Sequence, residues 1–284
     1  MFVIIGAVVV LGAVLGGFVI EGGPILVLMQ FVEFIIIGGA AIGGLLISAP
    51  AKLLKKIIQQ VLGTMKGSPF TNQLYMDLLK MMYELFQIGQ KEGFIALESH
   101  IENPSKSSVF SKYPHFLSHH HLVTFMTDTI RLVLIGGVAP HEIEGLMDTD
   151  IETHQQEGSK PAMILQKVGD SLPGLGIVAA VLGIVITMQA INGPPEVIGH
   201  KVAVALVGTF VGILISYGFV QPLATNLDLG HEEETRVYEV IKAGLISFSK
   251  GFNPLVSVEF ARRTIFSDCR PSFQEMEKLV KGKK

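Results

Sequence analysis

Cysteine and charge are both scarce in this 284-residue sequence, which holds one cysteine, Cys269, and no tryptophan. A single thiol cannot form a disulfide within the chain, so nothing points to an oxidising compartment. Charged residues make up 17% of the chain against 49% apolar residues, and the mean hydropathy is +0.50. This composition is too apolar for an ordinary soluble protein and too charged for one that lies wholly in a membrane.

Motifs of catalytic and nucleotide-binding sites are also missing. The chain has no glycine loop that ends in Gly-Lys-Ser or Gly-Lys-Thr, no serine elbow and no evident pair of catalytic carboxylates. We therefore expect neither an enzyme nor a nucleotide-driven transporter, and no cofactor is indicated.

Four long apolar runs predict four transmembrane helices, because a bilayer core of about 30 Å requires roughly 20 apolar residues in a helix. The clearest pair, 171–191 and 202–222, is joined by a turn at residues 192–195. The first pair, 1–20 and 34–49, is joined by a loop that Glu21 and Glu33 flank. None of these four predicted spans contains an ionisable residue. If the protein conducts an ion, the carrier carboxylate must then come from another polypeptide.

Basic residues are confined almost entirely to two segments. Lys and Arg number 11 between Pro50 and Lys167 and 10 between Leu227 and Lys284, and only Lys201 lies elsewhere. The positive-inside rule places both segments, and with them both termini, in the cytoplasm. The first apolar run lacks the basic start of a secretory signal and a second run follows at once, so we expect a retained helix.

The charged segments carry helical patterns and no sustained strand pattern. An amphipathic stretch at 51–67 is typical of a helix that lies on lipid headgroups, and packing on another cytoplasmic helix is the alternative. Helices are expected over 70–99, 117–135 and 140–157. The fold class is an all-α membrane protein with segments 1–50 (first hairpin), 51–167 (helical cytoplasmic domain), 168–226 (second hairpin) and 227–284 (helical cytoplasmic tail).

A histidine cluster raises the question of a metal site. His115 and His119 have the i, i+4 spacing that can bind a metal on a helix, and His120 and His121 follow. No carboxylate accompanies them at a suitable spacing, so we predict no metal site there.

Uncharged polar residues in the second hairpin have two explanations. Thr187, Thr209, Ser216 and Tyr217 could offer hydroxyl groups along an ion path. Alternatively, each hydroxyl could bond a neighbouring helix or the carbonyl four residues earlier in its own helix.

Several blocks resemble one membrane protein family. The run ALVGTFVGILISYGFVQP, residues 205–222, is similar to the signature of the flagellar stator A subunit (MotA) family. VGDSLPGLGIVAAVLGIV, residues 168–185, resembles the start of that family's third span. The blocks FVIEGGP, LYMDLL, HIENP, EIEGLMD, DIETH and RPSF extend the resemblance from the first span to Phe273.

This resemblance implies a stator unit in the bacterial inner membrane that converts ion-motive force into torque. In the family, five A subunits surround two single-span B subunits, whose membrane aspartate carries the ion. By resemblance, Pro173 and Pro222 couple ion flow to movement, Thr209 faces the partner's aspartate, and Asp170 lies at the cytoplasmic mouth. Thr187 and Tyr217 are further candidates for the ion path.

Rotor contacts are expected from the cytoplasmic domain. Glu98 matches a charged residue of the family that acts on the rotor switch complex, and Asp150 is a further candidate. Gln90 stands where the family usually has arginine, and Lys91 beside it would project about 100° away around a helix. Phe31 replaces a family proline between the first two spans.

Two other functions remain open on the sequence. An energiser of the ExbB/TolQ type would have three spans rather than four, and a membrane scaffold would conduct no ion. A proton is favoured over sodium as the driving ion because of the overall similarity of the chain to the proton-driven branch.

Overall fold

The computed structural model describes residues 2–189 and 191–281, and within them every regular element is helical. The chain divides into two compact units. Unit 1 comprises residues 1–67 and 158–229, and unit 2 comprises residues 68–157 and 230–284. The amphipathic segment after the first hairpin thus belongs to the apolar unit, and the C-terminal tail belongs to the same unit as the domain that precedes the third span.

Unit 1 holds the apolar helices. Its elements are α1 (Phe2–Ile20), α2 (Ile25–Leu28), α3 (Phe31–Ser48), α4 (Ala51–Thr64), the C-terminal part of α9 (Pro140–Met188), α10 (Pro195–Ile215), the π-helical turn η4 (Ser216–Val220) and the start of α11 (Gln221–Ser249). By length and composition, four helical segments could cross a membrane: 2–20, 25–48, and the apolar parts of 140–188 and 195–249.

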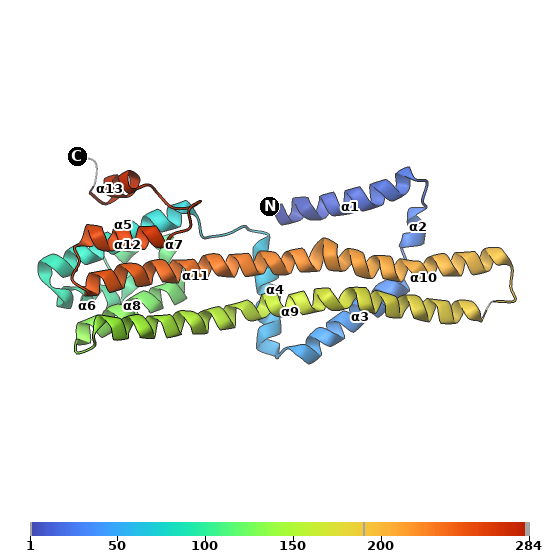
Figure 1. Ribbon diagram of the computed structural model, residues 1–284, viewed down its shortest axis with the longest axis horizontal. Coiled ribbons are helices and arrows are strands. Elements are labelled where there is room, and N and C mark those ends of the chain that lie inside the picture. Colours follow the sequence, from blue (N-terminus) through green and yellow to red (C-terminus); the bar gives the residue numbers. More distant parts are fainter. Residues whose placement is uncertain (1, 190, 282–284) are drawn as a thin grey trace. The chain divides into compact units, whose positions relative to one another are not determined.

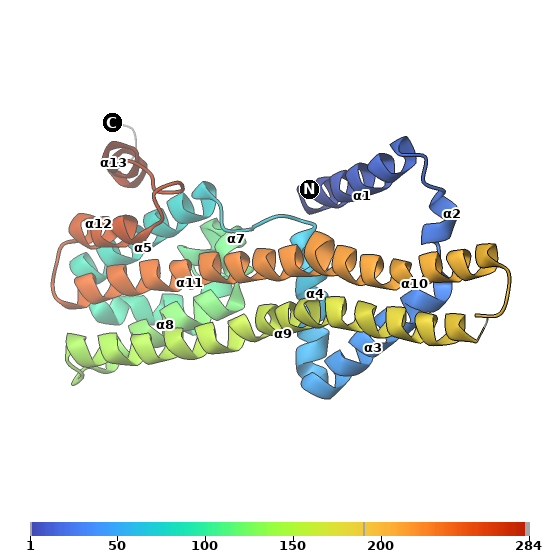
Figure 2. The ribbon, with the colours of Figure 1, turned by 45° about the vertical axis from the view of Figure 1, so that its right-hand side comes forward.

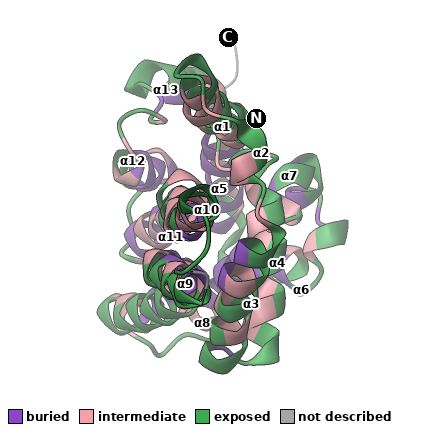
Figure 3. Cartoon of the chain, turned by 90° about the vertical axis from the view of Figure 1, so that its right-hand side faces the viewer, coloured by how far each residue is buried: buried purple, intermediate pink, exposed green. Residues whose placement is uncertain are grey.

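Few large side chains are buried inside unit 1. Its core consists of Ile37, Leu172, Ala179, Val207 and Val211. Helix α1 contains no buried residue, and Figure 3 shows α1 without buried colour. The apolar part of α9 and α10 run side by side (Figures 1 and 2).

Unit 2 is a bundle of shorter helices. Its elements are α5 (Asn72–Glu92), η1 (Phe94–Leu97), α6 (Glu98–Glu102), η2 (Pro104–Lys106), η3 (Phe110–Lys112), α7 (Pro114–Leu117), α8 (His120–Ile135), the N-terminal part of α9, the C-terminal part of α11, α12 (Pro254–Thr264) and α13 (Phe273–Lys281).

Three predicted helix boundaries in unit 2 were wrong. The helix expected over 70–99 stops at Gly93, whose φ of 86° lies in the left-handed region that glycine adopts without strain. The helix expected over 117–135 begins at His120, and Leu117 is instead the last residue of the short helix α7. The helix expected over 140–157 continues without interruption to Met188, so it and the third span are one helix.

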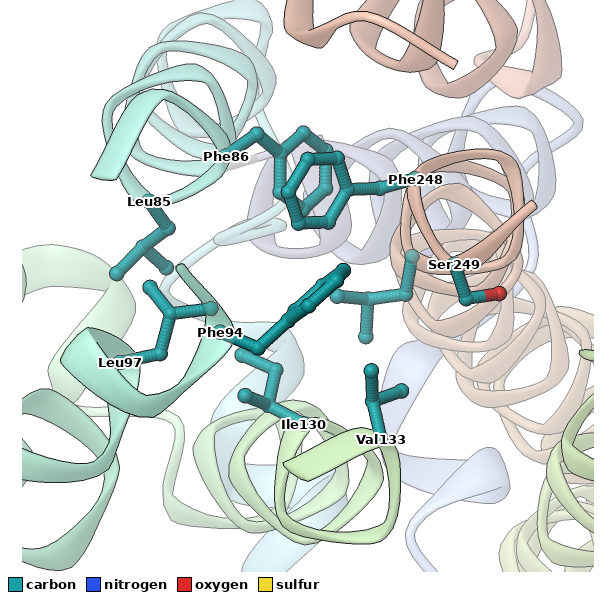
Figure 4. Close-up of a pocket in the computed structure, with 9 residues that line it drawn as sticks. Leu85, Phe86, Phe94, Leu97, Ile130, Val133, Phe248 and Ser249 are labelled. Atoms are coloured by element: carbon teal, nitrogen blue, oxygen red, sulfur yellow. The ribbon is translucent and has the colours of Figure 1, made fainter. Parts of the chain in front are cut away.

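The core of unit 2 is dense and aromatic. Phe86 and Phe248 stack with ring centroids 4.4 Å apart, and Phe94 lies 5.3 Å from Phe248 (Figure 4). The apolar cavity beside these rings has a volume of about 10 Å³, which is about the size of one water molecule. It therefore offers no room for an organic ligand.

Candidate functional site: the hairpin and its π-helical turn

The two helices of the second hairpin meet along a line of small residues. Gly169, Gly176 and Gly183 recur every seven residues along α9. A Cβ atom on Gly176 would lie 2.8 Å from the carbonyl oxygen of Gly208 on α10, and one on Gly212 would lie 2.6 Å from that of Leu172. Because only glycine fits such a separation, the two backbones are in direct contact, as is typical of helices that associate in lipid.

Helix α10 ends in a π-helical turn directly before Pro222. The backbone N–H of Gln221 donates to the carbonyl of Ser216, five residues earlier. Proline has no N–H, and in a regular helix its ring would clash with the carbonyl four residues earlier, here Gly218. The wider turn accommodates this conflict, and such single π-turns occur often at functional sites.

Polar contacts join this turn to α9. The hydroxyl of Ser216 donates to the carbonyl oxygen of Gly169 at 2.7 Å. Asp170 Oδ1 accepts from the side-chain amides of Gln221, at 3.0 Å, and Gln166, at 3.1 Å. Gln221, which precedes Pro222, is thus hydrogen-bonded to Asp170, which lies about one helical turn before Pro173.

The residues predicted for the ion path lie in different environments. Pro173 is half-buried within α9, and Pro222 is exposed in the first turn of α11. Thr209 is half-buried and follows Gly208 in the line of small residues, whereas Tyr217 is 61% exposed. Thr187 donates to the carbonyl of Gly183 at 2.8 Å, which is the local bond weighed as an alternative in the sequence.

Sequence reasoning missed two residues of this site. Gln221 was not singled out, although it precedes the proline and supplies the contact to Asp170. The pairing of Gly169 with Gln221 was also missed: a Cβ on this glycine would lie 2.8 Å from Cγ of Gln221. The seven-residue spacing of the glycines in α9 is the signal that could have indicated this contact surface.

One predicted boundary in this unit was wrong, and the difference places a carboxylate in an apolar helix just outside the predicted span 34–49. Helix α3 begins at Phe31, not at residue 34, so Glu33 lies in its first turn, inside a segment that could cross a membrane. Glu33 is 5% exposed, its Oε2 has no hydrogen-bond partner, and this oxygen lies 2.8 Å from the Cβ position of Gly208. The need for a carboxylate from another polypeptide therefore does not follow from the spans alone.

The residues predicted to face a rotor all lie on the surface of unit 2. Gln90 and Lys91 occupy the last turn of α5, and Glu98 is the first residue of α6, beyond the short helix η1. Asp150 is exposed on α9. All four side chains are accessible to a partner.

The histidine cluster of the sequence does not form the helical pair that its spacing suggested. His115 lies in α7 and His119 precedes α8, so the two do not lie on one helix, and their ring centroids are 5.5 Å apart. Burial and the neighbouring His115 lower the pKa of His119. A different pair, His154 and His231, comes together across α9 and α11, and their separation of 77 positions in the sequence prevented its prediction.

These features define the class: a helical, multi-pass membrane protein whose third and fourth apolar segments form a closely packed hairpin with a polar, proline-marked end. Comparisons with known proteins give the family. Residues 4–93 match the motility protein A N-terminal model, and residues 118–240 match the MotA/TolQ/ExbB proton channel family.

Known relatives extend over almost the full chain. Motility protein A of Salmonella typhimurium is 41% identical over 99% of this chain and 96% of its own length, and that of Escherichia coli is 40% identical over 100% and 96%. The structure of C. jejuni MotAB superposes with a TM-score of 0.78 at 21% identity, over 95% of this chain and 98% of that chain. The chain belongs to the motility protein A family, the stator subunits that form the proton channel of the flagellar motor.

Proposed function

We propose that this chain assembles as a ring of five around two single-span B subunits in the bacterial inner membrane. Both termini face the cytoplasm, and proton flow through the complex turns the rotor. The distribution of Lys and Arg supports the orientation. The similar C. jejuni structure is that of MotAB, which supports the B subunit as the partner.

The observation that carries the mechanism is the joined end of the hairpin. The π-helical turn, Pro222 and the contact of Gln221 with Asp170 lie where α10 passes into α11. A π-turn and a proline are the usual places where a helix bends. A change of charge on the partner's aspartate beside Thr209 would change its attraction to the surrounding helices, and bending at Pro173 and Pro222 would carry that change into unit 2.

Unit 2 then delivers the movement to the rotor. Glu98, Lys91 and Asp150 supply exposed charges of both signs, and Gln90 supplies an uncharged position where the family usually has arginine. Electrostatic engagement through Glu98 is favoured for this chain. Thr187 is proposed to act as a helix-packing group rather than as an ion ligand, because its hydroxyl is bonded within its own helix.

Proline substitutions test this proposal. Pro173→Ala and Pro222→Ala should abolish rotation of tethered cells, because each restores a regular helix, while membrane level and co-purification with the B subunit stay normal. Pro161→Ala is the matched control, since Pro161 also lies inside α9 but before the apolar run. Normal torque in either of the first two variants would refute the coupling role.

A further inference from the structure

Three side chains with metal-binding atoms converge in unit 2. His154 lies on α9, and His231 and Glu234 lie one turn apart on α11. One ligand atom from each lies within 4.8 Å of the other two. The N-terminal part of α9 and the C-terminal part of α11 lie side by side in Figures 1 and 2, so the cluster links two long helices within this unit.

The nitrogens face one carboxylate oxygen, but neither is hydrogen-bonded to it. His154 Nε2 lies 3.7 Å and His231 Nδ1 lies 3.8 Å from Glu234 Oε2. Both distances exceed the 2.7–3.2 Å of an N–H···O bond. His154 Nε2 is buried and has no hydrogen-bond partner.

The second nitrogen of His231 fixes the tautomer of this ring. His231 Nε2 lies 3.2 Å from the carbonyl oxygen of Gln155. A carbonyl only accepts, so Nε2 carries the hydrogen, and in the neutral ring Nδ1 presents its lone pair to Glu234. A histidine that donates one N–H to a backbone carbonyl and directs its other nitrogen to a shared centre has the arrangement typical of a metal ligand.

The two nitrogen-to-carboxylate distances are close to those that a small bound ion would set. With metal–ligand bonds of 2.0–2.2 Å, two ligands at a tetrahedral angle lie about 3.4 Å apart. The observed 3.7 Å and 3.8 Å need only a small closure to reach that value. The ring of His154 packs on Tyr238, with centroids 4.5 Å apart, which restricts the orientations that this ring can adopt.

We propose that His154, His231 and Glu234 bind one divalent transition-metal ion of the Zn²⁺ type. Two imidazoles and one carboxylate are a ligand set that zinc accepts, with water in the fourth position. Imidazole ligands favour Zn²⁺ over Mg²⁺ and Ca²⁺, which prefer oxygen. His154 and Glu234 are partly exposed, at 23% and 29%, so solvent ions can enter. The ion would fasten α9 to α11, independently of the stator role.

Zinc binding to the full chain tests the site. The detergent-solubilised chain is stripped with a chelator and titrated with Zn²⁺ against a chromophoric competitor. We expect one tight site per chain, with affinity at least 10-fold weaker in His154→Gln, His231→Gln and Glu234→Gln. His120→Gln, which changes an exposed histidine on α8, should bind like the unmodified chain. Equal affinity in all four variants would overturn the proposal.

A second measurement does not depend on how the variants fold. Zn²⁺ should raise the melting temperature of the unmodified chain, because an ion that binds only the folded state stabilises it. Equimolar Mg²⁺ should have no such effect. A melting temperature that Zn²⁺ leaves unchanged would exclude the metal site.

Discussion

The two units bury their surfaces by different means. Among the residues that the structure describes, all but one of the largest fully buried side chains belong to unit 2, the exception being Ile37. In unit 1 the two helices of the second hairpin approach through their backbones, at Gly176 and Gly212, and large side chains such as Ile47, which is 90% exposed, point outward. In water, the hydrophobic effect favours burial of large apolar side chains in a core, as in unit 2. In lipid, close packing of small residues holds helices together, as in unit 1.

Gly212→Ala is expected to give the largest effect, because it separates the two backbones of the hairpin. The added Cβ would lie 2.6 Å from a carbonyl oxygen and 3.0 Å from Gly176 Cα, and neither atom can move alone. We expect a loss of about 3 kcal/mol in stability, at the upper end of overpacking, together with lost motility. Thermal unfolding in detergent measures the first and soft-agar swarming the second.

Gly174→Ala provides the control for that prediction. It lies two residues from Gly176 on the same helix, and its Cβ would meet no atom within 4 Å. The substitution should leave the stability unchanged or raise it, because alanine is favoured over glycine inside a helix by about 1 kcal/mol. Equal losses at both positions would mean that backbone contact does not hold the hairpin.

Gly244→Ala in unit 2 is expected to have a smaller effect. Its Cβ would overlap the side-chain methyl of Met82, which is the end of a flexible side chain rather than backbone. We expect a loss of about 1 kcal/mol, partly offset by helix propensity, in chemical denaturation of the same preparation. A loss as large as that of Gly212→Ala would erase the distinction between the two units.

The sequence predicted the helical class and the apolar segments because these depend on composition over about 20 residues. Its predictions of helix ends failed, because a single residue can determine where a helix begins or ends. Helix α3 begins three residues before the predicted start, which brings Glu33 into the buried surface. Gly93 ends α5, although the apolar pattern continues beyond it.

The candidate site was only partly predictable for a related reason. Pro173, Pro222 and Asp170 were expected from the resemblance of local motifs to those of the family, and each lies at or near the polar end of the hairpin. The contact of Asp170 with Gln221 spans 51 positions, and the cluster of His154 with His231 spans 77. No periodicity within one helix carries information about which residues of another helix will face it.

The smallest expected effect comes from an ion pair on α12 and tests whether charge also stabilises unit 2. Glu259 accepts from Nε of Arg262 and from Nε of Arg263, both at 2.7 Å, and Arg262 also donates to the carbonyl of Pro271 at 2.8 Å. Hydrogen bonding from Arg262 holds the pKa of Glu259 below its usual 4.5, although burial opposes this shift.

Because the folded pKa is lowered, the stabilisation is present above the unfolded pKa and disappears as the pH falls through the folded value. Glu259→Gln should therefore cost about 0.5 kcal/mol at pH 7 and less at pH 3. Urea midpoints at the two pH values measure the difference, with Glu102→Gln, an exposed change on α6, as the control. A cost that is the same at both pH values would mean that Glu259 stabilises unit 2 by packing rather than by its charge. The two units would then differ only in how their side chains and backbones pack.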